Sequence, residues 1–359
     1  MTARARDGTN LVKLVKMAIP ICKQAQRQCP RAGPGRPPNF PDWKMAVLIM
    51  AAILKRRKSK SAQYRFLHEH RREFRQWLSL DRFPARSTYF DRYHQAHRIF
   101  KVAVGLQGKK AVKEGLTTAT TVAVDKSLLR ARGPLWHKKD RKKGRIPRGL
   151  HGVDRDSTWA FSKHHGWVQG YSYEVVVTAG KGSTVLPLLA SADTANVSEH
   201  VSFADKIESL PASTKNVLAD SGYDNNDYGQ RIERDTQNRR TGRRFICPAN
   251  PRNSRQESKD TESTLAGAKG SSQRYRQQRI RFYHSPEGNR LYAQRSGSVE
   301  PFNEWFKSLF GLDQTVWHRG LDNNGTQILG AFFCYQLLLR YNCRCGNKNG
   351  QVQWILDTL

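Results

Sequence analysis

The residues best placed to do chemistry in this sequence are three acids in widely separated segments. Asp125 ends the apolar run 117–124, Asp220 ends the run 217–219, and Glu300 lies near the start of a predicted helix. Buried runs that end in a carboxylate are typical of strands that deliver an acid at their C-terminal ends. An Asp in such a position is also a common turn or cap residue, which is the structural alternative for each.

The helix that carries Glu300 also presents a second acid and a base. Glu300, Glu304 and Lys307 fall at i, i+4 and i+7 and therefore share one face. Pro301 suits the first turn of this helix, and Gly311 suits its end. Glu304 competes with Glu300 for the role of third acid, and a plain surface helix with weak Glu–Lys pairs is the structural alternative. The opposite face is predicted to be buried and consists of Val299, Phe302, Phe306, Leu309 and Phe310.

The order of the predicted elements indicates where the three acids meet. Three strands, a helix and a fourth strand place the strands that end in Asp125 and Asp220 side by side in a mixed α/β sheet. Carboxylates that converge there with Glu300 repel one another unless a cation lies between them, and hard divalent cations prefer such oxygen ligands. Two such ions clamp the attacking and leaving oxygens of a phosphodiester. The residues therefore favour metal-assisted phosphoryl transfer.

Residues 1–110 are predicted to form a small all-helical DNA-binding domain. Short helices with basic outer faces and short turns are typical of helix-turn-helix DNA readers, although small helical domains also arise without DNA. The Pro- and Gly-rich segment 30–38 is predicted as a linker. The helical patterns cover 11–29, 43–54, 61–78 and 87–100.

Residues 111–345 are predicted to form a mixed α/β catalytic domain. β-branched runs predict a five-stranded sheet, with a meander that ends near residue 190 and later strands at 217–219 and 243–247. Helices flank this sheet, among them an apolar one at 331–341. A polar insertion is predicted at about 248–280 and a C-terminal tail at 346–359.

The charge of the chain indicates a polyanionic partner. Lys and Arg number 62 against 30 Asp and Glu, which gives a net charge of +32. Nucleic acid is the expected partner, and 138–148 is a strongly basic loop. No membrane association is expected, because the longest apolar run, 45–54, is too short to span a bilayer. The segment 11–22 is a poor signal peptide, so the predicted location is the cytoplasm, associated with the nucleoid.

The six cysteines do not follow a metal-binding pattern. None forms a CxxC pair, and the sequence holds neither a GxGxxG nor a Walker A motif. Cys343 and Cys345 with His318 form one conceivable ligand set, but incidental thiols in a reduced compartment are the preferred interpretation.

Several motifs together resemble the DDE transposases of prokaryotic insertion sequences, in particular the IS-four-like group, over nearly the whole chain. The last of them is Tyr292, Arg295, Glu300 and Lys307, which resembles the family's Tyr, Arg, Glu, Lys signature. The spacing from Arg295 to Glu300 is one residue longer than in that signature, which leaves Arg290 as an alternative. The other motifs are Gly35-Arg-Pro37, Thr121-Val-Ala-Val-Asp125, Gly166-Trp-Val-Gln-Gly170-Tyr171, Ala195-Asn-Val197 and Leu218-Ala-Asp220-Ser-Gly-Tyr223.

The resemblance implies an RNase H-like catalytic domain in which Asp125, Asp220 and Glu300 bind two Mg²⁺ or Mn²⁺ ions. It implies that Arg295 and Lys307 contact phosphates near the scissile bond. Tyr292 would then position or stack near the flanking nucleotide. The partners implied are the inverted-repeat ends of the element and the target DNA, with a homodimer or larger assembly on DNA.

Three hypotheses follow. The leading one is a transposase that catalyses metal-dependent cleavage at element ends and strand transfer into target DNA. The second is an RNase H-like DNA nuclease without strand transfer, and the third is a catalytically inactive, basic DNA-binding protein. Metal dependence separates the third from the others, because charge-driven binding needs no metal and weakens steeply with salt.

Overall fold

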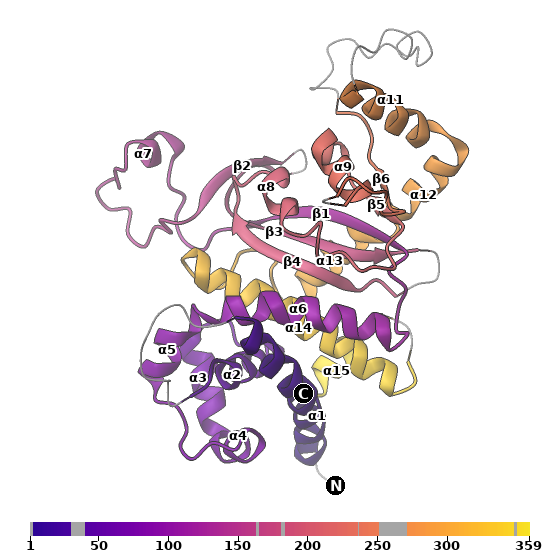
Figure 1. Cartoon of the computed structure of the whole chain (residues 1–359). Coiled ribbons are helices and arrows are strands. Elements are labelled where there is room, and N and C mark those ends of the chain that lie inside the picture. The colour runs from indigo at the N-terminus through magenta and orange to yellow at the C-terminus, as the bar shows by residue number, and fades with distance from the viewer. Residues whose placement is uncertain are drawn as a thin grey trace.

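The computed structural model describes residues 3–29, 40–162, 165–180, 184–235, 237–250, 271–347 and 350–359. Its first part is helical (Figure 1). Ser59 caps α3 by accepting a hydrogen bond from the backbone N–H of Ala62 at 3.1 Å. The helices are α1 (Ala3–Gln28), α2 (Asp42–Leu54), α3 (Lys60–Glu69), α4 (Arg71–Leu78), α5 (Arg86–Tyr93) and α6 (Ala96–Lys113).

A six-stranded mixed sheet follows, one strand more than the predicted five. The central path runs β2-β3-β1-β5-β6, and β4 pairs with the other edge of β3. β1 is antiparallel to β3 and parallel to β5. β2 lies within the predicted meander, although it begins earlier than the predicted strand at 161–166, and it extends β3 beyond the body of the sheet (Figure 1). The strands are β1 (Thr121–Arg130), β2 (Thr158–Ser162), β3 (Gly166–Ala179), β4 (Pro187–Thr194), β5 (Asn216–Leu218) and β6 (Arg244–Ile246).

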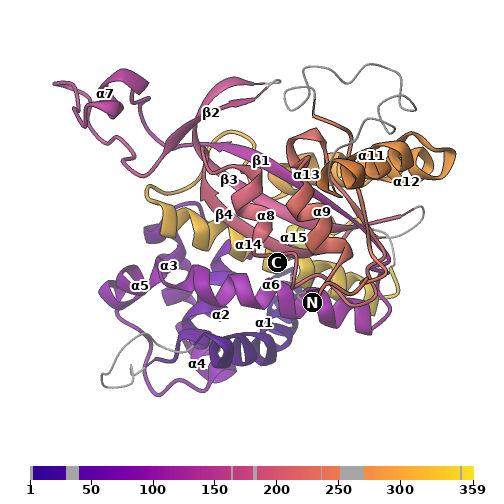
Figure 2. The same cartoon turned by 45° about the horizontal axis from the view of Figure 1, so that its top comes forward.

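Helices and one basic arm surround the sheet. α6 and α14 lie along one face of it, and the chain between β1 and β2, with α7, projects away from the body (Figures 1 and 2). α13 packs on β1, α12 on β5, and α9 and α11 on β6. The helices are α7 (Lys138–Lys142), α8 (Glu199–Ala204), α9 (Asn226–Glu233), α11 (Ser271–His284), α12 (Pro286–Ser296), α13 (Val299–Leu309), α14 (Leu321–Arg344) and α15 (Gln353–Asp357), with a short 3₁₀ helix η1 (Ser221–Tyr223).

The core is continuous from the N-terminal helices to the sheet because α14 is buried on almost every side. α14 packs on α2 and α6 and also on β4. A Cβ at Gly330 would lie 2.5 Å from Ile53 Cδ1 and 3.2 Å from Phe100, so glycine is what lets the three helices approach this closely. The polar side chains that α14 buries have hydrogen-bond partners, as Gln336 does with the Val104 and Pro187 carbonyls and Arg340 with Glu114.

Several predicted elements differ in extent from the structure. The predicted helix 61–78 is two helices that meet at His70, and the pattern at 87–100 is α5 followed by the longer α6. The predicted tail contains α15, in which Ile355 and Leu356 are buried. The end of the predicted polar insertion is helical from residue 271. The predicted linker 30–38, with the motif Gly35-Arg-Pro37, and residues 251–270 lie outside the described residues, so the domain boundaries stay predictions.

Candidate functional site

Parallel pairing of β1 and β5 brings two of the predicted acids to one place. The pairing joins Val122 to Val217 and Ala123 to Leu218, and two residues further along each chain stand Asp125 and Asp220. Asp220 also caps η1, because its Oδ1 accepts a hydrogen bond from the Gly222 N–H at 2.8 Å. One oxygen of Asp220 therefore serves the turn, as the structural alternative expected, and the other faces the site.

Arg295 is the common partner of all three predicted acids. Its Nη2 lies 2.7 Å from Asp125 Oδ1 and 4.0 Å from Asp220 Oδ2, and its Nη1 lies 3.5 Å from Glu300 Oε1. The arginine comes from the last turn of α12 and Glu300 from the first turn of α13. The Arg295 side chain is only 9% exposed, against 63% for Glu300, so the cation is the buried centre of the cluster.

Both oxygens of Asp125 are held in place. Oδ1 pairs with Arg295, and Oδ2 accepts a hydrogen bond from Asn303 Nδ2 at 2.7 Å. Asn303 in turn accepts one from the Tyr173 hydroxyl of β3 at 2.9 Å. The sequence reasoning did not find Asn303. A signal was present, because Asn303 is a polar residue beside Phe302 on the apolar face of the helix.

Burial and like charge make Asp125 difficult to ionise. Burial raises the pKa of Asp125 to about 6, and the charges of Asp220 and Glu300 act in the same direction. The Arg295 guanidinium opposes this and lowers the pKa. The positive charge of Arg295 therefore partly relieves the mutual repulsion that the acid cluster was predicted to have.

The two other predicted DNA-contact residues flank this centre. Burial lowers the pKa of Lys307, and the negative charges of Asp125 and Glu304 oppose the shift. Burial raises the pKa of Tyr292 to about 12, with Arg295 acting against it. The Tyr292 ring lies 5.0 Å from that of Tyr283. Tyr292 and Lys307 thus stand on either side of the Arg295 cluster, and both are half-buried.

A fourth carboxylate, Glu199 of α8, lies at the edge of the site and was missed. A Cβ at Gly222 would lie 2.0 Å from Glu199 Oε2 and 3.0 Å from Asp220 Oδ1, which places the two carboxylates next to each other. Burial raises the pKa of Glu199 to about 7, and Asp220 is the largest charge acting in the same direction. Its position two residues after the motif Ala195-Asn-Val197 was the available signal.

The donor chemistry of the cluster fits hard divalent cations. Asp125, Asp220 and Glu300 supply carboxylate oxygens, and all three already share one positive group. Among the described residues, no three acids, histidines or cysteines are arranged to enclose an ion as they stand. The reason at this site is that the guanidinium of Arg295 lies among the carboxylates. The three carboxylates therefore have the oxygen chemistry that divalent cations prefer.

Asp154, Asp156 and His318 have structural partners. Asp154 accepts hydrogen bonds from the Tyr171 hydroxyl and from the Gly320 N–H, and Asp156 accepts one from Leu321 N–H at the start of α14. Burial lowers the pKa of His318 to about 3, and its ring is hydrogen-bonded to the Tyr93 hydroxyl.

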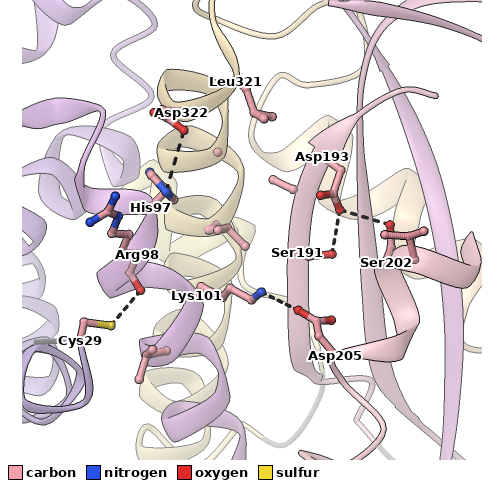
Figure 3. A pocket seen from close by; sticks show the side chains of 15 residues that line it. Cys29, His97, Arg98, Lys101, Ser191, Asp193, Ser202, Asp205, Leu321 and Asp322 are labelled. Carbon is pink, nitrogen blue, oxygen red and sulfur yellow. Dashed lines mark hydrogen bonds and ion pairs between the residues drawn. The ribbon is translucent and has the colours of Figure 1, made fainter. Parts of the chain in front are cut away.

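A cavity of about 700 Å³ between α6, α14, β4 and α8 lies apart from the acid cluster (Figure 3). None of the three predicted acids lines it. Two of its polar pairs join the walls of the cavity, since Lys101 Nζ lies 2.6 Å from Asp205 and His97 lies 3.9 Å from Asp322. Nothing in this lining points to the chemistry of the acids.

Fold and site together define a mixed α/β protein with an acid-rich centre formed where Asp220 follows the end of β5 and Asp125 lies within β1. The prediction that a strand ends at Asp125 is wrong, because β1 stays paired with β3 as far as Arg130. Residues 116–337, more than half of the chain, match the family model of the transposase DDE domain, and the chain belongs to this family. Comparison with curated proteins and with solved structures gives no match. Membership supports a transposase function and an enzyme that acts on DNA, and transposase DDE domains generally use divalent metal ions.

The matched region contains the whole predicted site. Asp125, Asp220, Glu300 and Arg295 all lie within it, whereas α1 to α5 lie before it. No helix in the described ranges is long and apolar enough to span a membrane. The IS-four-like group, the prokaryotic origin and the cytoplasmic location stay predictions.

Proposed function

We propose that the chain catalyses metal-dependent DNA cleavage at the ends of a mobile element and joins the freed strand to target DNA. The observation that carries the proposal is the meeting of three carboxylates, from segments up to 175 residues apart, around Arg295. Asp125, Asp220 and Glu300 would hold two Mg²⁺ or Mn²⁺ ions. Bound there, such ions activate a nucleophile and stabilise the charge that develops on a phosphodiester.

The residues of the chain have separate tasks in the proposed reaction. Asn303 and the backbone around η1 hold the carboxylates of Asp125 and Asp220 in position. Arg295 turns from the acids to a DNA phosphate, and Lys307 contacts a second phosphate. Tyr292 packs near the flanking nucleotide. Water attacks first and releases a 3′-hydroxyl, and that hydroxyl then attacks the target, so that each step forms one P–O bond and breaks one.

Substitution of Asp125 by Asn tests the proposal. We expect D125N to lose cleavage of an element end by on the order of 10³-fold or more, because a neutral amide binds a divalent cation poorly. Binding of the same DNA in EDTA should stay close to wild type. Full cleavage by D125N in Mg²⁺ would refute the assignment.

A strand-transfer assay separates the proposal from its alternatives. Joined products with a target plasmid support a transposase, and cleavage that never yields them supports a nuclease of the same fold. Binding without any cleavage, equal in EDTA and in Mg²⁺, identifies an inactive DNA-binding protein. On DNA we expect a homodimer or a larger assembly, because two ends must be joined, and sedimentation of the complex tests this.

A further inference from the structure

An exposed aromatic pair lies on the hairpin of β2 and β3, away from the acid cluster. Phe161 and Trp167 are opposite each other in the sheet, with their rings 5.6 Å apart, yet the two are 59% and 57% exposed. Large apolar side chains gathered on a surface usually mark a contact with a partner. The surroundings of the pair indicate which kind of partner it contacts.

Positive charge surrounds the pair. Lys138 Nζ lies 4.3 Å from the Trp167 ring centre, and α7 with its neighbouring loops carries six more cations and one acid, Asp140. Within the described ranges none of these cations has a carboxylate within ion-pair distance. A second copy of this chain would bring a net charge of +32 against them, whereas DNA brings phosphates. The six are Lys139, Arg141, Lys142, Lys143, Arg145 and Arg148.

The arm is tied firmly to the hairpin. The backbone N–H of Trp136 donates to Gln169 Oε1 at 2.7 Å, and its indole N–H donates to the Arg145 carbonyl at 2.9 Å. The indole of Trp159 donates to the Trp136 carbonyl at 2.8 Å. The cations of α7 are therefore presented by a structure with defined contacts to β2 and β3.

Sheet register places the pair on the same face as Asp125. Asp125 is opposite Val175, and the alternating row from Val175 through Tyr173 leads to Trp167. Tyr173 in this row reaches Asn303, the partner of Asp125, which confirms the face. Eight residues of strand at about 3.3 Å each separate Trp167 from Val175, the residue opposite Asp125, so the pair lies about 26 Å along β3 from the level of Asp125, or about eight base pairs of DNA.

We propose that Phe161 and Trp167, with the cations of α7, form a second DNA contact on one side of the cleavage position. The cations bind backbone phosphates there, and Trp167 packs on bases that are opened from their stack. This inference rests on the proposed function, because it places the contact relative to the cleaved phosphate.

Binding of W167A in EDTA to a fluorescent duplex that carries an element end tests the contact. We expect about tenfold weaker binding, since one base on an aromatic side chain is commonly worth that much. W167F should restore most of the affinity. Trp354 of α15, which is 40% exposed, provides the matched control, and W354A should bind as wild type. Equal binding by W167A and W354A would overturn the proposal.

The position of the Trp167 contact along the DNA is tested with the same duplex. 2-Aminopurine placed beside the opened base, about eight base pairs from the cleavage position, should brighten with wild type because it loses a stacking neighbour, and it should stay dark with W167A. The W167A penalty should vanish on duplexes trimmed to about four base pairs on that side. A penalty that persists on trimmed DNA, or a W167A variant that loses self-association while binding DNA normally, overturns the proposal. Cleavage by wild type with no W167A effect refutes this contact alone, whereas no cleavage by wild type refutes the proposed function.

Discussion

The acid cluster and the α7 arm use arginine and lysine in opposite ways. Arg295 is nearly buried and lies among three carboxylates, so its charge is compensated inside the protein. The cations of the arm are mostly exposed and have few acids near them. Arg295 is already neutralised by the carboxylates around it. The cations of the arm are not neutralised in this way, so they attract a polyanion such as DNA. The acid cluster is therefore the region expected to carry the chemistry, and the α7 arm is the region expected to bind DNA.

The largest expected effect comes from exchanging acids of the cluster for amides. We expect E300Q to lower DNA cleavage by on the order of 10³-fold, as for a direct metal ligand, and E199Q by about tenfold, as for a neighbour of a ligand. E304Q should stay within about threefold of wild type. Glu304 is exposed and close in sequence, which makes it the matched control.

Measured cleavage rates of E300Q, E199Q and E304Q in Mg²⁺ test this order of effects. A loss in E304Q as large as that in E300Q would mean that Glu304, the rival from the sequence reasoning, is the third acid.

A smaller effect is expected on the way the free energy of unfolding depends on pH. Because the pKa of Asp125 is raised from 3.8 to about 6, the folded protein keeps this proton to higher pH than the unfolded chain does. Asp125 therefore lowers the free energy of unfolding as pH rises from about 4 to about 6, by about 2 kcal/mol. D125N lacks this contribution, so its stability relative to wild type should increase over that window.

Urea unfolding of both proteins in EDTA measures the difference, and titrating groups that do not interact with Asp125 cancel in it. A constant difference between pH 4 and pH 7 would show that the Asp125 pKa is not raised.

The smallest expected effect is in the arm, where single charges contribute through salt-dependent binding. The triple variant K138Q/K142Q/K143Q should reduce the slope of log affinity against log salt by about one for each lysine that contacts phosphate. Cleavage of bound DNA should stay unchanged, because these residues are far from the acids.

The matched control, K109Q/K113Q/K215Q, removes the same charge near the start of β1 and β5, at the opposite end of the sheet from the arm. Equal slopes of log affinity against log salt in the two triple variants would mean that DNA binding depends only on net charge. The arm would then not be a distinct DNA-binding surface.

Local patterns in the sequence predicted the elements that carry the acids. The β-branched run before Asp125 forms β1, and the apolar face that includes Phe302 and Phe306 is buried in α13. Both signals are local, because alternation and helical period show within a few residues. Element boundaries were less predictable. α3 and α4, predicted as one helix, separate at His70, and β1 continues past Asp125 to Arg130.

The sequence by itself determined that strands carry the chain to Asp125 and to Asp220, the faces of the helix with Glu300, and the excess of positive charge, but not that β1 continues past Asp125 to Arg130. Only the tertiary structure decided that Arg295 lies among the acids, that Asn303 holds Asp125, and that Glu199 stands beside Asp220. Periodicity reports which side of an element is buried, but contacts between distant segments depend on the register and direction of strand pairing. Those are set by packing of the whole core.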